Sequence, residues 1–180
     1  MDKTLEVLVV DDKEENIKAA GEYFSRRDDV KVDFAMNYNE ALRKLEENVY
    51  AIAIFDLELP RNHGEKTEKL GFELAREATK YAIPWAVITS GIGHHNKGII
   101  AFVSYSWEGI RDVNERLTEV GFPKTDPRSW QEVYETLIED TPTIIETFEA
   151  KKRYKNNVGR QFQLDPVIAE ALVPGFKKDD

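Results

Sequence analysis

The 180-residue chain contains no cysteine, and this absence excludes disulfide scaffolds, cysteine-ligated zinc, iron–sulfur clusters and thiol catalysis. Positive charge is also scarce, because 34 Asp and Glu residues outnumber 25 Lys and Arg residues and give a formal net charge of −9. Nucleic-acid binding requires a basic face for the phosphates, so this charge disfavours a nucleic-acid partner. No apolar run is long enough to span a bilayer, and the first ten residues lack the apolar core of a signal peptide. We therefore expect a cytoplasmic protein that binds neither nucleic acid nor membrane.

The first half of the chain alternates between apolar, β-branched runs and segments with helical periodicity. Strands are predicted at Leu5–Val10, Val30–Ala35, 51–55 and Trp85–Thr89. Helices are predicted around the apolar stripe of Ile17, Ala20 and Phe24, over 39–48 and over 70–81. This alternation predicts βαβ units and therefore a parallel sheet covered by helices on both faces.

The second half of the chain is less regular. A glycine-rich loop is predicted at 90–98 and a strand at 99–105. Helices are predicted at 111–120, from an N-cap at Ser129 to Ile138, and at 143–154.

Polar side chains follow the predicted parallel strands at their carboxyl ends, where ligands bind in such sheets. Asp11 and Asp12 follow the first strand, Asp56 follows the third, and Thr89 ends the fourth. Three carboxylates at one edge repel each other, so a cation is needed, and oxygen ligands without cysteine suit Mg²⁺. A carboxylate beside Mg²⁺ can attack phosphorus and form an aspartyl phosphate, which a nearby hydroxyl and lysine would stabilise.

Three stretches of the chain, VLVVDDKEEN, IAIFDLELP and PWAVITSG, resemble the receiver domain of two-component response regulators. That family has an acidic pair after the first strand, a phosphoacceptor Asp followed four residues later by Pro, and a Thr or Ser closing the fourth strand. Asp56 and Pro60 have this spacing. The resemblance covers 4–89 and, more loosely, 111–139. It implies an α/β fold with a doubly wound, five-stranded parallel sheet in the flavodoxin-like order 2-1-3-4-5.

The resemblance also implies roles for particular residues. Asp56 would accept a phosphoryl group from a histidine kinase or a phosphotransfer protein. Mg²⁺ would be ligated directly by Asp12 and Asp56, largely through water by Asp11, and by the main-chain carbonyl of Glu58. Thr89 would move toward the phosphoryl group and report its presence. The family's remaining site residue is a lysine, for which Lys124 is the best match.

The chain departs from the family's pattern at three places. The segment 61–70 after the phosphoacceptor is longer than usual, and an irregular insertion of about 91–110 separates Thr89 from Lys124 by 35 positions (124 − 89). Thr125 stands where the family usually has proline. If 99–105 is instead the fifth strand, its end carries Tyr105 or Glu108 and no lysine. The aromatic switch residue of the family would accordingly be Phe122 or Tyr105.

These observations predict a receiver domain at 4–140, with insertions after the third and fourth strands, and a helical C-terminal extension and tail at 141–180 without an effector domain. The expected function is a stand-alone, phosphorylation-dependent switch that signals to a downstream protein by direct contact. It would act on itself only, by assisting its own phosphorylation and dephosphorylation. Two alternatives are a receiver-fold scaffold that does not use phosphotransfer and, less favoured, a phosphatase that forms an aspartyl phosphate.

Overall fold

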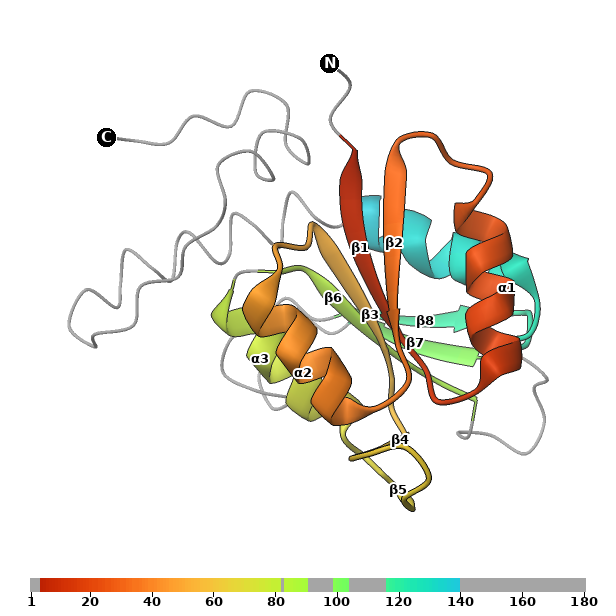
Figure 1. Ribbon diagram of the computed structural model, residues 1–180. Helices are drawn as coiled ribbons and strands as arrows, with labels where there is room; N and C mark the ends of the chain where they lie inside the picture. Colours follow the sequence, from red (N-terminus) through yellow and green to blue (C-terminus); the bar gives the residue numbers. More distant parts are fainter. Residues whose placement is uncertain (1–3, 82, 91–98, 104–115, 140–180) are drawn as a thin grey trace, which may run out of the picture.

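The computed structural model describes residues 4–81, 83–90, 99–103 and 116–139 (Figure 1). A six-stranded sheet has the order β2-β1-β3-β6-β7-β8, and a two-stranded sheet pairs β4 with β5. The strands are β1 (Leu5–Val10), β2 (Val30–Ala35), β3 (Ile52–Asp56), β4 (Leu59–Pro60), β5 (Thr67–Glu68), β6 (Trp85–Thr89), β7 (Ile99–Val103) and β8 (Arg116–Val120). The helices are α1 (Glu14–Phe24), α2 (Tyr38–Glu47), α3 (Gly71–Lys80) and a helix over 127–139.

The four strands predicted in the first half are confirmed, and they are parallel in the order β2-β1-β3-β6. Successive side chains of a strand point to opposite faces of the sheet. Val7 and Val9 of β1 therefore pack with α1 and the helix over 127–139, whereas Leu8 and Val10 pack with α2 and α3. Because both faces are covered, the central strands are apolar at nearly every position, as parallel strands in α/β proteins are.

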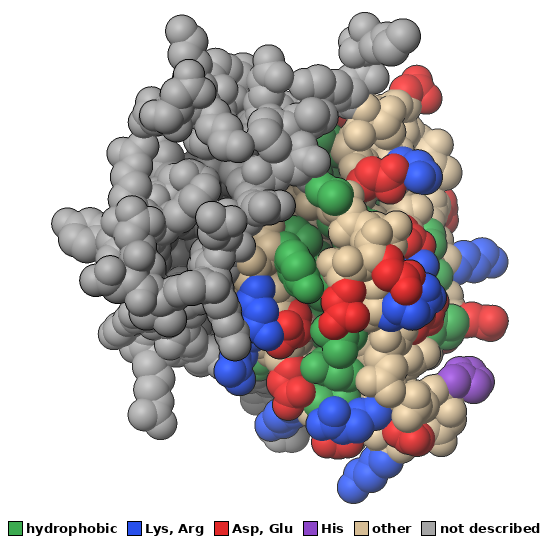
Figure 2. Space-filling view, turned by 60° about the vertical axis from the view of Figure 1, so that its left-hand side comes forward, with side chains coloured by type: hydrophobic (Ala, Val, Ile, Leu, Met, Phe, Trp, Pro, Cys, Tyr) green, Lys and Arg blue, Asp and Glu red, His purple; other side chains and the backbone are tan. Residues whose placement is uncertain are grey.

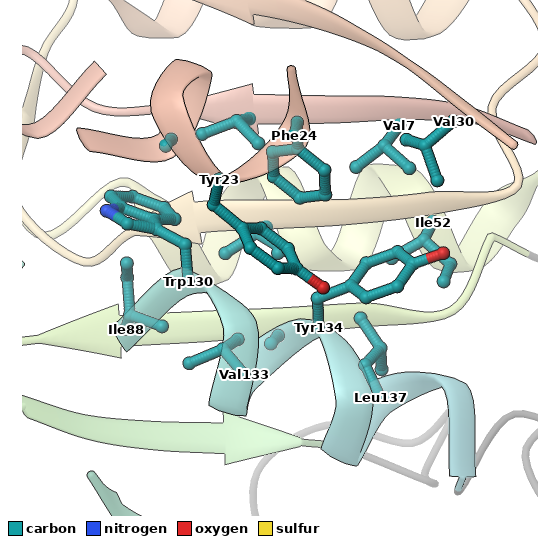
Figure 3. Packing of buried hydrophobic residues seen from close by; sticks show 14 of the residues in the cluster. Val7, Tyr23, Phe24, Val30, Ile52, Ile88, Trp130, Val133, Tyr134 and Leu137 are labelled. Carbon is teal, nitrogen blue, oxygen red and sulfur yellow. The ribbon is translucent and has the colours of Figure 1, made fainter. Parts of the chain in front are cut away.

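A group of packed aromatic side chains lies on one face of the sheet, between α1 and the helix over 127–139 (Figure 3). The ring of Tyr134 lies edge-on to Phe24, with ring centroids 5.4 Å apart. Trp130 belongs to the same cluster and is 1% exposed. This packing fixes the last described helix against the strands that precede it.

The prediction of five parallel strands is corrected at the far side of the sheet. β7 is antiparallel to β6, and β8 is antiparallel to β7, so six strands form a mixed sheet. Only nine residues (90–98) connect β6 to β7, and a parallel connection needs a crossover of a dozen residues or more. The chain must therefore return in the opposite direction.

The predicted helix over 111–120 is wrong for residues 116–120, which form β8. Leu117 and Val120 have helical spacing, but the segment pairs with β7, with Val120 opposite Ile99. Tertiary pairing thus outweighs a short local pattern. The predicted strand at 99–105 is confirmed for β7. The remainder of the predicted insertion, Tyr105, the predicted helix at 143–154 and the extension at 141–180 lie outside the described residues.

The long segment after Asp56 forms a hairpin at the carboxyl edge of the main sheet (Figure 1). Leu59 pairs with Glu68 and Pro60 with Thr67, and Gly64 takes the positive φ of +83° that the turn requires. Asn39 of α2 donates its backbone N–H to the carbonyl of Arg61 (3.1 Å) and its side-chain amide to Asn62 (2.9 Å). These contacts attach the hairpin to the start of α2.

Acidic and basic side chains are interspersed on the face shown in Figure 2. Ion pairs link Arg43 to Glu47 (2.6 Å) on α2, and Lys80 to Glu77 on α3. The described part of this face carries no continuous basic stripe. Within the described ranges, no helix has the length and apolarity to cross a membrane.

Candidate functional site

The carboxyl ends of β1 and β3 bring three carboxylates together. β1 and β3 are adjacent and parallel, with Val10 opposite Phe55, so Asp11 and Asp56 follow at neighbouring positions. Oxygen atoms of Asp11, Asp12 and Asp56 all lie within 4.8 Å of one another. Asp11 and Asp56 are buried, with exposed fractions of 0% and 5%, and Asp12 is half-buried.

The first turn of α1 fixes the orientation of Asp11. Its Oδ1 accepts hydrogen bonds from the backbone N–H of Lys13 (3.0 Å) and from the side-chain amide of Asn16 (2.9 Å). Asn16 is itself buried. The sequence analysis missed Asn16, although an amide one helical turn after an acidic pair is a signal of such a contact.

Lys124 enters the cluster from a distant part of the chain. Its ammonium Nζ lies 2.5 Å from Asp56 Oδ1 and 3.1 Å from Asp11 Oδ2, and the residue is 5% exposed. The mixed sheet explains this placement: two antiparallel steps, from β6 to β7 and from β7 to β8, restore the original strand direction. β8 therefore ends at the same edge as β1 and β3, and three residues separate its last residue from Lys124.

Burial controls the protonation of the cluster. Loss of hydration raises the pKa of Asp56 to about 6, because it outweighs the attraction of the Lys124 ammonium, and the Asp11 carboxylate adds to the rise. Burial and the proximity of Asp11 likewise raise the pKa of Asp12. At neutral pH Asp56 is largely ionised and, lacking full hydration, carries a carboxylate suited to nucleophilic attack.

Thr89 is buried at the end of β6, beside the cluster. β6 pairs with β3 such that Ile88 lies opposite Asp56, and the carbonyl of Ile88 accepts the N–H of Leu57 (2.8 Å). Thr89 therefore follows directly after the strand partner of Asp56. Glu58 is exposed, and its backbone N–H lies 3.4 Å from Asp56 Oδ1.

Comparison with protein families identifies this arrangement. The model of the response regulator receiver domain matches residues 7–96, which is half of the chain. The chain belongs to the response regulator receiver domain family. Comparison with curated proteins and with solved structures gave no match. Membership implies a phosphorylation-dependent switch in two-component signalling, a partner among histidine kinases or phosphotransfer proteins, and the Mg²⁺ that receiver domains typically bind.

The carboxylates of this receiver domain fit a divalent magnesium ion. Three carboxyl groups and the Lys124 ammonium have a formal net charge of −2, which a divalent cation balances. Carboxylate oxygens are hard ligands of the kind that Mg²⁺ prefers, and half-buried Asp12 leaves a route for water to complete the coordination. The cluster could thus hold Mg²⁺ next to the side chain of Asp56.

The receiver domain packs a glycine directly against Asp56, which the sequence analysis missed. Gly71, the first residue of α3, donates its N–H to the carbonyl of Leu57 (3.1 Å). A Cβ at this position would lie 2.2 Å from the carbonyl oxygen of Asp56 and 2.8 Å from the Cα of Leu57. A glycine opening a helix shortly after the acidic strand end was the available signal. Only a residue without a side chain allows α3 to approach this loop so closely.

Of the two candidate aromatic switch residues, the structure describes Phe122. It is half-buried against the core, and the guanidinium of Arg128 lies 3.9 Å from its ring centroid. Phe122 also lies two residues from Lys124, on the segment that leaves β8.

Proposed function

We propose that this receiver domain is a switch in which Asp56 accepts a phosphoryl group from a histidine kinase or a phosphotransfer protein. The observation that carries the proposal is the contact of Lys124 with both Asp56 and Asp11 inside a buried carboxylate cluster. A buried ammonium between two carboxylates is costly to form without a function or a compensating network. Phosphoryl transfer needs such a cation, placed where negative charge develops.

The proposed transfer is an in-line displacement at phosphorus. A carboxylate oxygen of Asp56 forms the new P–O bond while the P–N bond to the donor histidine breaks. The electron pair of that bond stays on the imidazole nitrogen, which takes up a proton. The ammonium of Lys124 and the hydroxyl of Thr89 would donate hydrogen bonds to the phosphoryl oxygens.

Mg²⁺ would be held by the side chains of Asp12 and Asp56, by Asp11 largely through water, and by the main-chain carbonyl of Glu58. When bound, the ion neutralises charge on the phosphoryl group during transfer. The three carboxylates and their net charge support this assignment.

Phosphorylation would change the output surface through Lys124. In the unphosphorylated state Lys124 contacts Asp56 and Asp11, and a phosphoryl group on Asp56 would offer the ammonium new oxygen partners. We infer that the loop around Phe122 responds and that a downstream protein binds the altered surface. In this proposal the switch is the domain at 4–140, and the protein acts in the cytoplasm.

A receiver-fold scaffold that does not use phosphotransfer is the competing hypothesis. It was suggested by the irregular sequence between Thr89 and Lys124. The two ion pairs of Lys124 argue against it, because that irregular stretch includes a β-hairpin that carries the lysine back to the site edge.

Intact-mass measurement after incubation with acetyl phosphate or phosphoramidate tests the proposal. We expect a Mg²⁺-dependent gain of one phosphoryl group, labile to hydroxylamine, and no gain in Asp56→Asn. Asp33→Asn is the matched control, because Asp33 of β2 also pairs with a lysine, Lys44 (2.6 Å), but lies outside the cluster. It should be phosphorylated like the wild type. Equal phosphoryl uptake by Asp56→Asn would overturn the assignment, and folded wild-type protein that takes up none would favour the scaffold.

A further inference from the structure

Two side chains of the last described helix donate hydrogen bonds to the backbone that carries Lys124. The hydroxyl of Ser129 donates to the carbonyl of Pro123 (2.5 Å), and the indole N–H of Trp130 donates to the carbonyl of Lys124 (2.7 Å). Both residues are buried, with exposed fractions of 0% and 1%. Ser129 is therefore not the predicted N-cap: Asp126 caps the helix instead, accepting the N–H of Arg128 (3.0 Å).

The backbone at Lys124 depends on these donors because it has left the sheet. β8 ends at Val120, so Pro123 and Lys124 lie beyond the strand ladder, in the turn before the helix. A buried carbonyl without a hydrogen bond costs free energy comparable to a lost hydrogen bond. Trp130 satisfies the buried carbonyl of Lys124, and Ser129 adds a second hydrogen bond to the carbonyl of Pro123, which also accepts the backbone N–H of Asp126 (2.9 Å). Together these contacts hold the lysine's main chain.

Trp130 also connects this backbone to the strands of the site. Its ring belongs to the core cluster that contains Ile54 of β3 and Ile88 of β6. Figure 3 shows Trp130 and Ile88 in this cluster. Ile54 lies two residues before Asp56, and Ile88 directly precedes Thr89. The same side chain thus belongs to the core cluster of the strands that carry Asp56 and Thr89 and donates a hydrogen bond to the backbone of Lys124.

The contacts of Lys124 tolerate only a small displacement of its ammonium group. Its ammonium reaches Asp56 at 2.5 Å and Asp11 at 3.1 Å, so a displacement of about 1 Å would take at least one contact beyond hydrogen-bond distance. Misplacement of a catalytic group by about 1 Å can slow a reaction by about a hundredfold.

We propose that Ser129 and Trp130 are positioning residues for Lys124, which fix its main chain by side-chain hydrogen bonds so that its ammonium meets Asp56 and Asp11. This inference rests on the function proposed above for Lys124. It assigns to the start of the last helix a role in the phosphorylation reaction without contact to the phosphoryl group.

The chain contains a matched control for this role. Trp85 is also buried (6% exposed), and its indole N–H also donates one buried hydrogen bond, to Thr79 Oγ1 (2.9 Å). Trp85 lies at the start of β6, at the edge of the sheet opposite the site. Trp130→Phe and Trp85→Phe therefore remove the same donor from two buried places, and only the first lies next to Lys124.

The first measurement is competitive acetylation of the unphosphorylated full chain, with the modification of Lys124 quantified by peptide mass spectrometry relative to exposed Lys31. We expect Trp130→Phe to increase the labelling rate of Lys124 by about tenfold, because a loosened backbone exposes the ammonium more often. Trp85→Phe should leave the rate within about twofold of the wild type. General destabilisation alone would raise the rate equally in both variants, and that result would overturn the proposal.

The second measurement is the rate of acyl-phosphate formation as a function of phosphoramidate concentration with Mg²⁺. Trp130→Phe should lower the maximal rate by about tenfold with little change in the half-saturating concentration, and Trp85→Phe should change neither. Ser129→Ala should act in the same direction as Trp130→Phe in both measurements, and it replaces that variant if Trp130→Phe does not fold. Equal maximal rates in Ser129→Ala, Trp130→Phe and wild type would contradict the positioning role.

The two measurements separate this proposal from the proposed function. If the labelling rates differ as expected but the wild type takes up no phosphoryl group, then Ser129 and Trp130 position Lys124 and the phosphorylation function is wrong. If the wild type is phosphorylated but the two tryptophan variants behave alike in both measurements, the switch stands and the positioning role is wrong.

Discussion

The described residues up to 90 and those from 116 to 139 contribute opposite charges to one site, and they are built differently. The first region consists of parallel strands joined by helices, and its strand ends supply Asp11, Asp12 and Asp56. The second region consists of an antiparallel edge strand, a turn and a helix, and it supplies Lys124. Local strand order therefore places the carboxylates, whereas tertiary packing of a distant segment places the cation. The charge of the carboxylates is partly balanced only when the second region packs against the first and brings Lys124 to the site.

Removal of the cation breaks the link between the two regions and should have the largest effect. Lys124→Met leaves Asp11 and Asp56 buried without a partner, so we expect a loss of about 3–5 kcal/mol in the free energy of unfolding at pH 7.5 in EDTA. Urea denaturation measures this loss. Added Mg²⁺ should restore part of it, since the ion replaces the missing positive charge.

Lys44→Met is the control for the loss of a paired lysine. Lys44 pairs with Asp33, whose side chain is 35% exposed and can be hydrated when the lysine is lost. The loss should therefore be markedly smaller and insensitive to Mg²⁺. Equal losses in the free energy of unfolding of Lys124→Met and Lys44→Met would show that the buried ion pairs of Lys124 stabilise the protein no more than the half-buried pair of Lys44.

The pH dependence of stability should differ in sign between Asp56 and Asp33. The folded-state pKa of Asp56, raised to about 6, exceeds its unfolded value, so its stabilising contribution is complete below the unfolded pKa and is lost as pH rises through about 6. Burial alone would raise the pKa of Asp33, but hydrogen bonds from Lys44 and Tyr50 outweigh it and lower the pKa. Its contribution is present above the unfolded pKa and is lost as pH falls through the folded pKa.

Urea denaturation of Asp56→Asn, Asp33→Asn and wild type between pH 2.5 and pH 7.5 in EDTA tests these signs. Each tenfold change in proton affinity is worth about 1.4 kcal/mol, so Asp56→Asn should gain about 3 kcal/mol relative to wild type across this range. Asp33→Asn should instead lose stability relative to wild type as the pH rises. Parallel curves for Asp56→Asn and wild type would mean that the pKa of Asp56 is not raised by folding.

A side chain at Gly71 should destabilise the first region, because it would clash with the loop that follows β3. The Cβ of Gly71→Ala would lie 2.2 Å from the carbonyl oxygen of Asp56, so the backbone must move, at a cost of about 2 kcal/mol. Gly21→Ala is the control, because a Cβ in the middle of α1 meets only the ring of Phe34 at 3.7 Å. It should stabilise the protein by about 0.5–1 kcal/mol. Thermal unfolding distinguishes the two, and a stabilising Gly71→Ala would contradict the close approach.

Much of the first region could be predicted from the sequence because its signals are local. The strand Leu5–Val10 ends in four consecutive apolar residues, and the acidic residues that follow it and Asp56 mark the ends of buried strands. Parallel strands have their carboxyl ends at one edge, so the clustering of these carboxylates follows from the fold class. Gly71 and Asn16 were missed because their roles depend on how close α3 and α1 approach the loops, which no periodicity encodes.

The second region could not be predicted in the same way. The spacing of Leu117 and Val120 favours a helix, but the available partner strand β7 makes 116–120 a strand. The sequence offered Lys124 only through a resemblance and left the end of 99–105 as an alternative. The direction of β7 decides at which edge of the sheet β7 and β8 end. That direction depends on the length of the connection between β6 and β7 rather than on the residues of the strand itself.

The smallest expected effect compares one helix cap from each region. Asn37 caps α2 by accepting the N–H of Glu40 (2.9 Å), and Asp126 caps the helix over 127–139 by accepting the N–H of Arg128 (3.0 Å). Asn37→Ala and Asp126→Ala should each lower the free energy of unfolding by about 1 kcal/mol. Only Asp126→Ala should also slow acyl-phosphate formation, by about twofold, because its helix holds the backbone of Lys124. Chemical denaturation and intact-mass kinetics on the same samples test this, and equal kinetics in both variants would mean that the helix start does not control the lysine.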